Sequence, residues 1–256
     1  MKLNVHGGHS LKCRGASGLL DEVKEDRLVK NKLIEILKAN GHTVHDCTDD
    51  VSTTQSKNLS AIVKKCNAHD VDWDISIHLD CGRNDKKGDG KTGGCSVFIY
   101  DETEYKQALA VATAIANTLG IGFHGEPVKI DKNLYVLRKT EAKAMLIECC
   151  FVDDKDDYDK WSATKCAMAI ATAFGCKTDN VSRETPKTNT VKKKYFPTYT
   201  GTSTSIVDAL KTVKADSSFA YRSKIAKANN IQNYKGTQPQ NDKLLSLLKK
   251  GKLVKP

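Results

Sequence analysis

Short apolar stretches alternate with longer stretches of helical periodicity across the first 176 residues of this 256-residue chain. The strand-like stretches are 2–5, 42–44, 71–78, 96–100 and 144–150, and the helix-like stretches are 22–40, 58–66, 104–119 and 161–174. Strands that alternate with helices usually pair in parallel, with the helices packed on the sheet. The pattern therefore predicts an α/β fold with a largely parallel, mixed sheet flanked by helices. In such sheets, functional sites gather at the carboxyl ends of the strands.

The pattern changes after residue 176. Residues 177–203 are rich in threonine, lysine and asparagine and have no periodicity, which predicts a basic flexible linker. Residues 204–256 show three short helical patterns, at 205–213, 217–229 and 242–250, which predict a small all-α module. Its expected core consists of Ile206, Leu210, Phe219, Ile225, Ile231, Leu244, Leu247 and Leu248. We therefore expect a domain over 1–176, a linker over 177–203 and a module over 204–256.

The net charge of +10 is concentrated in the C-terminal part of the chain. Residues 177–256 hold 17 Lys and Arg against 5 Asp and Glu, whereas residues 1–176 hold 24 against 26. A basic tail on a nearly neutral domain favours an anionic partner, which is nucleic acid, anionic lipid or an anionic wall polymer. No apolar run reaches the ~18 residues of a membrane-spanning helix. The first ten residues lack the apolar core of a secretory signal, so we expect synthesis in the cytoplasm.

Four ionisable residues stand at strand ends, at a helix start or inside an apolar strand. His9 follows the first strand in GHS, Glu22 opens the first long helix, and His78 ends the strand in DWDISIHLD. Glu148 lies inside the apolar stretch AMLIECCF. A buried carboxylate that is charged and unpaired costs several kcal/mol, so Glu148 needs a partner or a raised pKa. A structural ion pair with Arg138 or a lysine is the alternative to a functional role.

Two histidines and two glutamates in such positions suggest a catalytic zinc site. The common open zinc site uses two histidines and one glutamate at roughly 2.0–2.2 Å, with water in the fourth position. The second carboxylate can then act as general base on that water. A buried histidine with ordinary hydrogen bonds remains the alternative for His78. A cysteine nucleophile at Cys149 or Cys150 is disfavoured, because a reactive thiolate needs an electropositive, exposed setting and Glu148 is adjacent.

The order of these motifs resembles that of a known enzyme family. The chain resembles the zinc-dependent N-acetylmuramoyl-L-alanine amidases of the Amidase_3 family in four motifs that come in the same order. These motifs are GHS, a glutamate that opens a helix, SIH, and an apolar strand with glutamate before CF. The forms found in clostridial phage endolysins are the most similar. AKAMLIECCFVDDKDDYDKW resembles the family's final catalytic strand and acidic turn, and GGCSVFIY and KNLYVLRKTEAKAM fall where the family has related segments. The resemblance covers residues 1 to about 175.

The resemblance implies one zinc ion bound by His9, Glu22 and His78, with Glu148 as the group that activates the water and passes its proton on. Glu25 competes with Glu22 for the third ligand position. The implied reaction is hydrolysis of the peptidoglycan amide between N-acetylmuramic acid and L-alanine. Because the glycan is linear, we expect a shallow, open groove. His6 lies inside the strand, where the family places no ligand.

Two residues depart from the family pattern. Asp80 stands where the family typically has asparagine, and Asp74 replaces the usual apolar residue before ISIH. Such carboxylates could alter the surroundings of the ligands or the substrate groove without removing the metal.

The basic module is expected to anchor the enzyme to the wall. Its lysines suit wall phosphates or carboxylates, and Phe219, Tyr221 and Tyr234 could stack on sugar if exposed. No nucleic acid is expected, because no helix shows an arginine- or asparagine-rich reading face. The enzyme would act at the bacterial wall after release from the cytoplasm. The alternatives are a zinc peptidase that cuts within the stem peptide, a wall-binding protein without catalysis, and a nucleic-acid-associated hydrolase with a basic tail.

Overall fold

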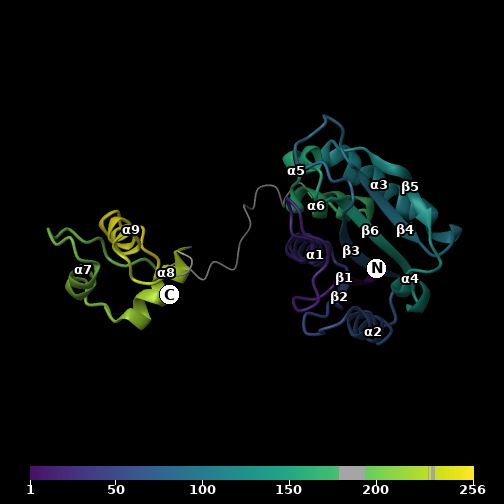
Figure 1. Ribbon diagram of the computed structural model, residues 1–256. Helices are drawn as coiled ribbons and strands as arrows, with labels where there is room; N and C mark the ends of the chain where they lie inside the picture. Colours follow the sequence, from purple (N-terminus) through teal and green to yellow (C-terminus); the bar gives the residue numbers. More distant parts are fainter. Residues whose placement is uncertain (179–193, 230, 232–233) are drawn as a thin grey trace. The chain divides into compact units, whose positions relative to one another are not determined.

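The computed structural model describes every residue except 179–193, 230 and 232–233 (Figure 1). The chain divides into two compact units, Met1–Arg183 and Glu184–Pro256. Residues 179–193, which make up most of the linker expected over 177–203, lie outside the described residues. Within the part of the chain that the structure describes, no helix is long and apolar enough to cross a membrane.

The described part of the first unit contains one six-stranded sheet with the strand order β2-β1-β3-β6-β4-β5. Its strands are β1 (Lys2–Gly7), β2 (Thr43–Asp46), β3 (Trp73–Asp80), β4 (Cys95–Ile99), β5 (Phe123–Ile130) and β6 (Lys143–Phe151). All neighbouring strands run parallel except β4 and β6, which are antiparallel. The prediction of a largely parallel, mixed sheet flanked by helices is confirmed.

Helices cover both faces of the sheet (Figure 1). They are α1 (Glu22–Ala39), α2 (Gln55–Cys66), the 3-10 helix η1 (Glu102–Glu104), α3 (Tyr105–Leu119), α4 (Tyr135–Lys139), α5 (Lys155–Lys160) and α6 (Ala163–Ala173). The main core lies where α1, α3 and α6 pack on one face. A smaller apolar cluster lies under α2 and α4 on the other face.

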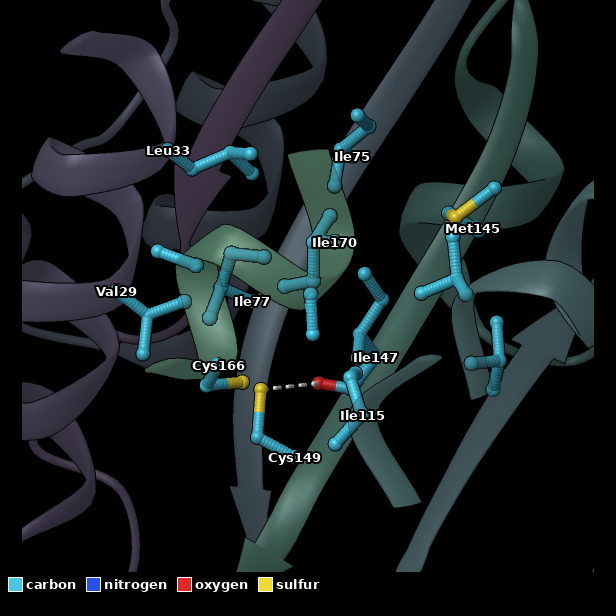
Figure 2. Packing of buried hydrophobic residues seen from close by; sticks show 14 of the residues in the cluster. Val29, Leu33, Ile75, Ile77, Ile115, Met145, Ile147, Cys149, Cys166 and Ile170 are labelled. Carbon is cyan, nitrogen blue, oxygen red and sulfur yellow. Dashed lines mark hydrogen bonds between the residues drawn. The ribbon is translucent and has the colours of Figure 1, made fainter. Parts of the chain in front are cut away.

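Strand register separates the core face from a polar face. Ile75 and Ile77 of β3 pair with Met145 and Ile147 of β6, and all four point toward α1 and α6 (Figure 2). Because side chains alternate along a strand, the intervening residues of β3 and β6 point to the α2 and α4 side. His78 of β3 pairs there with Glu148 of β6. One register therefore fixes both the core and the position of two candidate site residues.

Three elements were not expected from the sequence, namely β5, α4 and α5. β5 is mostly exposed and carries Pro127 and the positive-φ Gly125, so it has no clear alternation of apolar residues. Helices α4 and α5 have only five and six residues, too few for a helical period to stand out. The second predicted strand also lies slightly later than expected, at Thr43–Asp46.

The acidic turn after β6 stabilises the neighbouring loop through hydrogen bonds to its backbone. Asp157 is fully buried and accepts hydrogen bonds from the backbone N–H groups of Phe151 and Gly94. Asp153 accepts from the N–H groups of Gly82 and Asn84. These carboxylates therefore hold the loop before β4 against the end of β6.

The second unit is a small helical unit with helices α7 (Ile206–Thr212), α8 (Phe219–Ala228) and α9 (Gln238–Lys249). Residues 194–203, expected as linker, belong to it instead: Phe196 and Tyr199 are buried in its core, and Tyr195 pairs with Val254. The expected core position of Phe219 is wrong, because this ring is 52% exposed. Helix α9 begins at Gln238, four residues before the expected start of the pattern at 242, and Thr237 is its N-cap.

Helix α1 offers a matched test of this packing. Leu33→Ala removes a fully buried side chain from the main core and should lower the free energy of unfolding by about 2–5 kcal/mol. Leu28→Ala removes the same atoms from a position of the same helix that is 49% exposed, and should cost less than about 1 kcal/mol. Urea unfolding of both variants measures the difference. Equal losses would contradict the assigned faces of α1.

Candidate metal centre

His9, Glu22 and His78 converge on one point, although they come from a loop, a helix and a strand. One potential ligand atom from each lies within 4.8 Å of the others. Glu22 Oε1 is 3.3 Å from His9 Nε2 and 3.0 Å from His78 Nδ1. The two imidazole rings meet edge to face, with their centroids 5.3 Å apart. The chain therefore places three ligand-type side chains around a shared position.

His9 is held in an uncommon backbone conformation. Its φ of 54° lies in the left-handed region, which costs energy for a residue other than glycine. Its carbonyl oxygen accepts hydrogen bonds from Arg27 Nη2 at 3.0 Å and from Asn58 Nδ2 at 2.9 Å. Arg27 also donates to the carbonyl of Gly8 and is paired with Asp26 and Asp50. These contacts offset the strain and aim the imidazole at Glu22.

Glu22 is buried at the start of α1, directly after the N-cap Asp21. Its Oε2 accepts a hydrogen bond from the N–H of Ala16 at 2.7 Å, which leaves Oε1 to face the histidines. Burial by itself would raise the pKa of Glu22, but hydrogen bonds and charge from His78 and His9 hold this pKa well below its usual range. The carboxylate is therefore ionised, as a metal ligand must be.

Two glycines make room for this cluster. A Cβ atom at Gly8 would overlap the ring of His78, and a Cβ atom at Gly15 would overlap the carboxylate of Glu22. Neither glycine has a positive φ, so the backbone conformation does not require glycine at these positions. Glycine is required because the side chains of His78 and Glu22 approach the backbone too closely for a Cβ atom.

Glu148 lies beside this cluster on β6, in register with His78. Its Oε2 is buried without a hydrogen-bond partner among the described residues. Burial, and then the nearby charges of Asp80 and Glu22, raise the pKa of Glu148 well above its ordinary value, whereas Lys129 opposes this rise. No ion pair to Arg138 or to a lysine is formed within the described residues, so the structural alternative for Glu148 has no support.

The other residues named from the sequence have different surroundings. Glu25 accepts a hydrogen bond from Trp161 Nε1 at 3.0 Å and does not join the cluster. Asp74 is buried and accepts from Asn4 Nδ2 at 2.7 Å. His6 is buried with its Nδ1 3.4 Å from the hydroxyl oxygen of Ser76, and burial, followed by the charge of His78, lowers the pKa of His6 to about 3. His6 is therefore a neutral neighbour of the site.

The cysteines of β6 do not supply a nucleophile. Cys149 and Cys150 are fully buried. The pKa of Cys149 is raised by its contact with Cys166 and by burial, and the pKa of Cys150 is raised by burial. Figure 2 shows Cys149 among the core side chains, beside Cys166. Neither thiol has the electropositive, exposed setting of a reactive cysteine.

The donor set fits a zinc ion. Tetrahedral bonds of about 2.1 Å place neighbouring ligand atoms roughly 3.4 Å apart. The two distances from Glu22 Oε1, 3.0 and 3.3 Å, are close to this spacing. Two imidazoles and one ionised carboxylate are also the ligand types of open zinc sites. Four residues that shape this site were missed in the sequence analysis, namely Arg27, Asn58, Gly8 and Gly15. Only Gly8 had a signal in the sequence, because it belongs to the paired glycines of the GGHS motif.

A second group of carboxylates, Asp85, Asp154 and Asp156, also lies close together. Asp85 and Asp156 accept backbone hydrogen bonds from residues 88–90, and Asp154 pairs with Arg83. This group serves the local structure of the loop.

Comparison with known proteins gives relatives for the first unit. The chain is 34% identical over 160 residues to an uncharacterized protein of Clostridium perfringens, a match that covers 61% of this chain and 45% of the relative. It is 41% identical over 78 residues to the L-alanyl-D-glutamate peptidase of Listeria phage A118, of which 24% is covered. The chain thus spans less than half the length of these curated relatives.

Solved structures show the same fold. The catalytic domain of the CD27L endolysin, which targets Clostridia Difficile, matches with a TM-score of 0.56 and 29% identity, covering 68% of this chain and 96% of that one. The catalytic domain of CwlV, an amidase from Bacillus (Paenibacillus) polymyxa var. colistinus, matches with a TM-score of 0.57 and 21% identity, covering 71% and 99%.

The sequence model of one family matches residues 5–175, about two thirds of the chain, and these residues include all four candidate site residues. That family is Amidase_3, described as N-acetylmuramoyl-L-alanine amidase. The chain therefore belongs to the Amidase_3 family of N-acetylmuramoyl-L-alanine amidases.

Proposed function

We propose that this protein is a zinc-dependent N-acetylmuramoyl-L-alanine amidase that cleaves peptidoglycan between N-acetylmuramic acid and L-alanine. The observation that carries the proposal is the convergence of His9, Glu22 and His78 in a chain of the Amidase_3 family. Beside them lies the buried Oε2 of Glu148, which has no hydrogen-bond partner among the described residues. Residues 1–176 are the catalytic domain in this proposal.

His9, Glu22 and His78 would hold one zinc ion. Zinc in such a site polarises a substrate carbonyl and makes a bound water more acidic. The chain preorganises these three side chains through the hydrogen bond from Ala16 to Glu22 and through the bonds from Arg27 and Asn58 to the carbonyl of His9. Little rearrangement is then needed on metal binding.

Glu148 is the proposed general base and general acid. Its free Oε2 can take a proton from the attacking water and deliver it to the nitrogen of the leaving L-alanine. Burial raises the pKa of this carboxyl, which makes it able to keep the proton between these two steps. A buried Oε2 without a hydrogen-bond partner lowers the stability of the fold, which supports a catalytic role for Glu148 over a structural one.

The second unit is the proposed wall-binding module, over residues 204–256 together with the packed segment 194–203. It is rich in lysine, and its exposed Phe219 stacks on Tyr234 with ring centroids 5.7 Å apart. Arg222 lies over the Phe219 ring and donates to the Tyr234 hydroxyl oxygen at 2.9 Å. Lysines suit anionic wall polymer, and an exposed aromatic ring suits a sugar face. Peptidoglycan at the bacterial cell wall is thus the proposed place of action.

A peptidase that cuts within the stem peptide is the second candidate. The partial match to the Listeria phage L-alanyl-D-glutamate peptidase favours it. That match covers 30% of this chain, whereas the Amidase_3 match covers about two thirds, so the amidase is the stronger proposal.

The bond that is cut decides between these candidates. Digestion of purified Gram-positive peptidoglycan should release new alanine amino ends without new reducing sugars, and a zinc chelator should abolish this release until zinc is restored. End-group analysis of the digests is the measurement. New amino ends on other stem residues would instead establish the peptidase.

Metal binding and proton transfer can be separated by substitution. Glu148→Gln should keep about one zinc per chain but lower kcat by about 10²–10⁴-fold, because the amide cannot accept the proton. His78→Ala should lose both zinc and activity. Metal content after dialysis and initial hydrolysis rates check both variants. A Glu148→Gln enzyme with normal kcat would remove Glu148 from the mechanism.

Salt dependence tests the proposed module. Binding of the full chain to purified walls should weaken severalfold as NaCl is raised from low to high concentration, because lysine attraction to wall anions is screened. Walls stripped of anionic polymer should bind less protein at low salt. Cosedimentation measures both, with duplex DNA as the comparison. Tighter binding to DNA than to walls would favour a nucleic-acid partner.

A further inference from the structure

Two buried polar groups without hydrogen-bond partners lie next to each other in the β4–β6 pair. Ser96 of β4 is directly opposite Glu148 of β6 in this antiparallel pairing. Directly opposite residues of such a pair carry their side chains on the same face, with Cβ atoms about 4.5–5.5 Å apart. Among the described residues, neither Ser96 Oγ nor Glu148 Oε2 has a hydrogen-bond partner. The sheet therefore brings an unpartnered hydroxyl group beside an unpartnered carboxyl oxygen.

Glu148 lies between His78 and Ser96 in the order of the sheet. Strand β6 has β3 as its neighbour on one side and β4 on the other (Figure 1). His78 is the register partner of Glu148 on β3, and Ser96 is its register partner on β4. His78 and Glu148 line a cavity of about 440 Å³, whereas Ser96 is fully buried. A substrate in this cavity can therefore touch Glu148, and Ser96 can influence the reaction only through that carboxyl group.

The other neighbour of Ser96 is irregular. The pairing of β4 with β5 is interrupted at Ser96 by a bulge over residues 124–127. The ring of His124 in this bulge packs against Phe151, with the centroids 4.8 Å apart. Glu148 is thus the side chain in regular register with Ser96 that can accept a hydrogen bond.

A hydroxyl group suits a carboxyl group that takes up a proton and returns it. The two oxygens of Glu148 interchange by rotation about its Cγ–Cδ bond, so one oxygen can accept from Ser96 while the other faces the cavity. The oxygen that faces the cavity takes the proton from water and returns it to the leaving nitrogen. Ser96 keeps its own proton throughout and donates the same hydrogen bond before and after each transfer.

Glu148 has a flexible side chain, and its charged neighbours do not fix its direction. Asp80 and Glu22 lie near it and carry the same charge, so they repel the ionised carboxylate. We propose that Ser96 is a positioning residue, whose hydroxyl group donates a hydrogen bond to Glu148 and holds the carboxyl group beside the candidate metal centre. This inference rests on the proposed role of Glu148.

Two substitutions of the same shape isolate the hydroxyl group. Ser96→Thr keeps it, and Ser96→Val replaces it by a methyl group. On soluble muropeptides, Ser96→Thr should keep kcat within about threefold of the parent value, and Ser96→Val should lower kcat about tenfold or more, because the base is no longer held in place. KM should be the same in all three proteins, since Ser96 does not touch the substrate. Equal kcat values for the two variants would overturn the proposal.

A double-mutant cycle tests whether Ser96 acts through Glu148. Ser96→Ala should lower kcat about tenfold or more in the parent chain. In the Glu148→Gln background, the same substitution should cause no further loss. A further loss of similar size would show that Ser96 acts independently of Glu148 and would overturn the proposal. This cycle also replaces the first test if the Thr and Val variants fail to fold.

Val97→Ala is the control for a merely structural effect. Val97 is the next residue of β4 and is fully buried in the main core. Its truncation should lower the urea midpoint and leave kcat unchanged. Ser96→Ala should show the opposite pattern, with lower kcat but with the urea midpoint and the zinc content of the parent. A lower midpoint with unchanged kcat in Ser96→Ala would make Ser96 structural.

The contact itself can be observed without hydrolysis. A crystal structure of the zinc-loaded full chain should place Ser96 Oγ about 2.5–3.0 Å from a carboxyl oxygen of Glu148. A Ser96 hydroxyl group bonded to any other acceptor would overturn the proposal. If the parent chain cleaves no wall substrate but shows this contact, the amidase proposal fails and the contact stands. If the parent cleaves the amide and kcat does not respond to Ser96→Ala, the positioning role fails and the amidase stands.

Discussion

The register between β3 and its neighbours β1 and β6 is the constraint on which the rest of the first unit depends. Alternate residues of β3 enter the apolar core under α1 and α6, and the residues between them face α2 and α4. A shift by one residue would bury His78 in the core and expose Ile77 to the polar face. The same apolar packing that stabilises the sheet therefore also specifies the distance between His78 and Glu148.

Strain and charge at the end of β1 are offset locally. His9 takes a left-handed backbone conformation, and the carbonyl groups of Gly8 and His9 accept hydrogen bonds from Arg27. Arg27 is itself largely buried and is paired with Asp26 and Asp50, so its charge is compensated. This network connects α1 to the loop after β1 and thereby fixes the position of Glu22 relative to His9.

The sequence predicted most of the regular elements and the candidate site for identifiable reasons. Long periodic stretches such as α1 and apolar runs such as β6 carry their own signal, and Glu148 stood out because a carboxylate interrupts such a run. The resemblance to the amidases then selected His9, Glu22 and His78. The short helix α4 and the exposed strand β5 were missed because neither has enough buried positions to show a period. Arg27 and Asn58 were missed because their function depends on backbone carbonyls distant in sequence. Phe219 was misplaced, since an apolar residue in a helical pattern looks the same whether the ring is buried or exposed.

The candidate metal ligands and most of the lining of the neighbouring pocket lie on different parts of the chain. The candidate ligands and Glu148 belong to the loop after β1, to α1 and to the sheet, whereas α2 and residues 133–136 line the pocket of about 440 Å³ beside them. Helix α4 is five residues long and contributes no member of the ligand cluster. Substitutions in α4 can therefore change the lining of the pocket beside the candidate metal centre without changing any member of the ligand cluster.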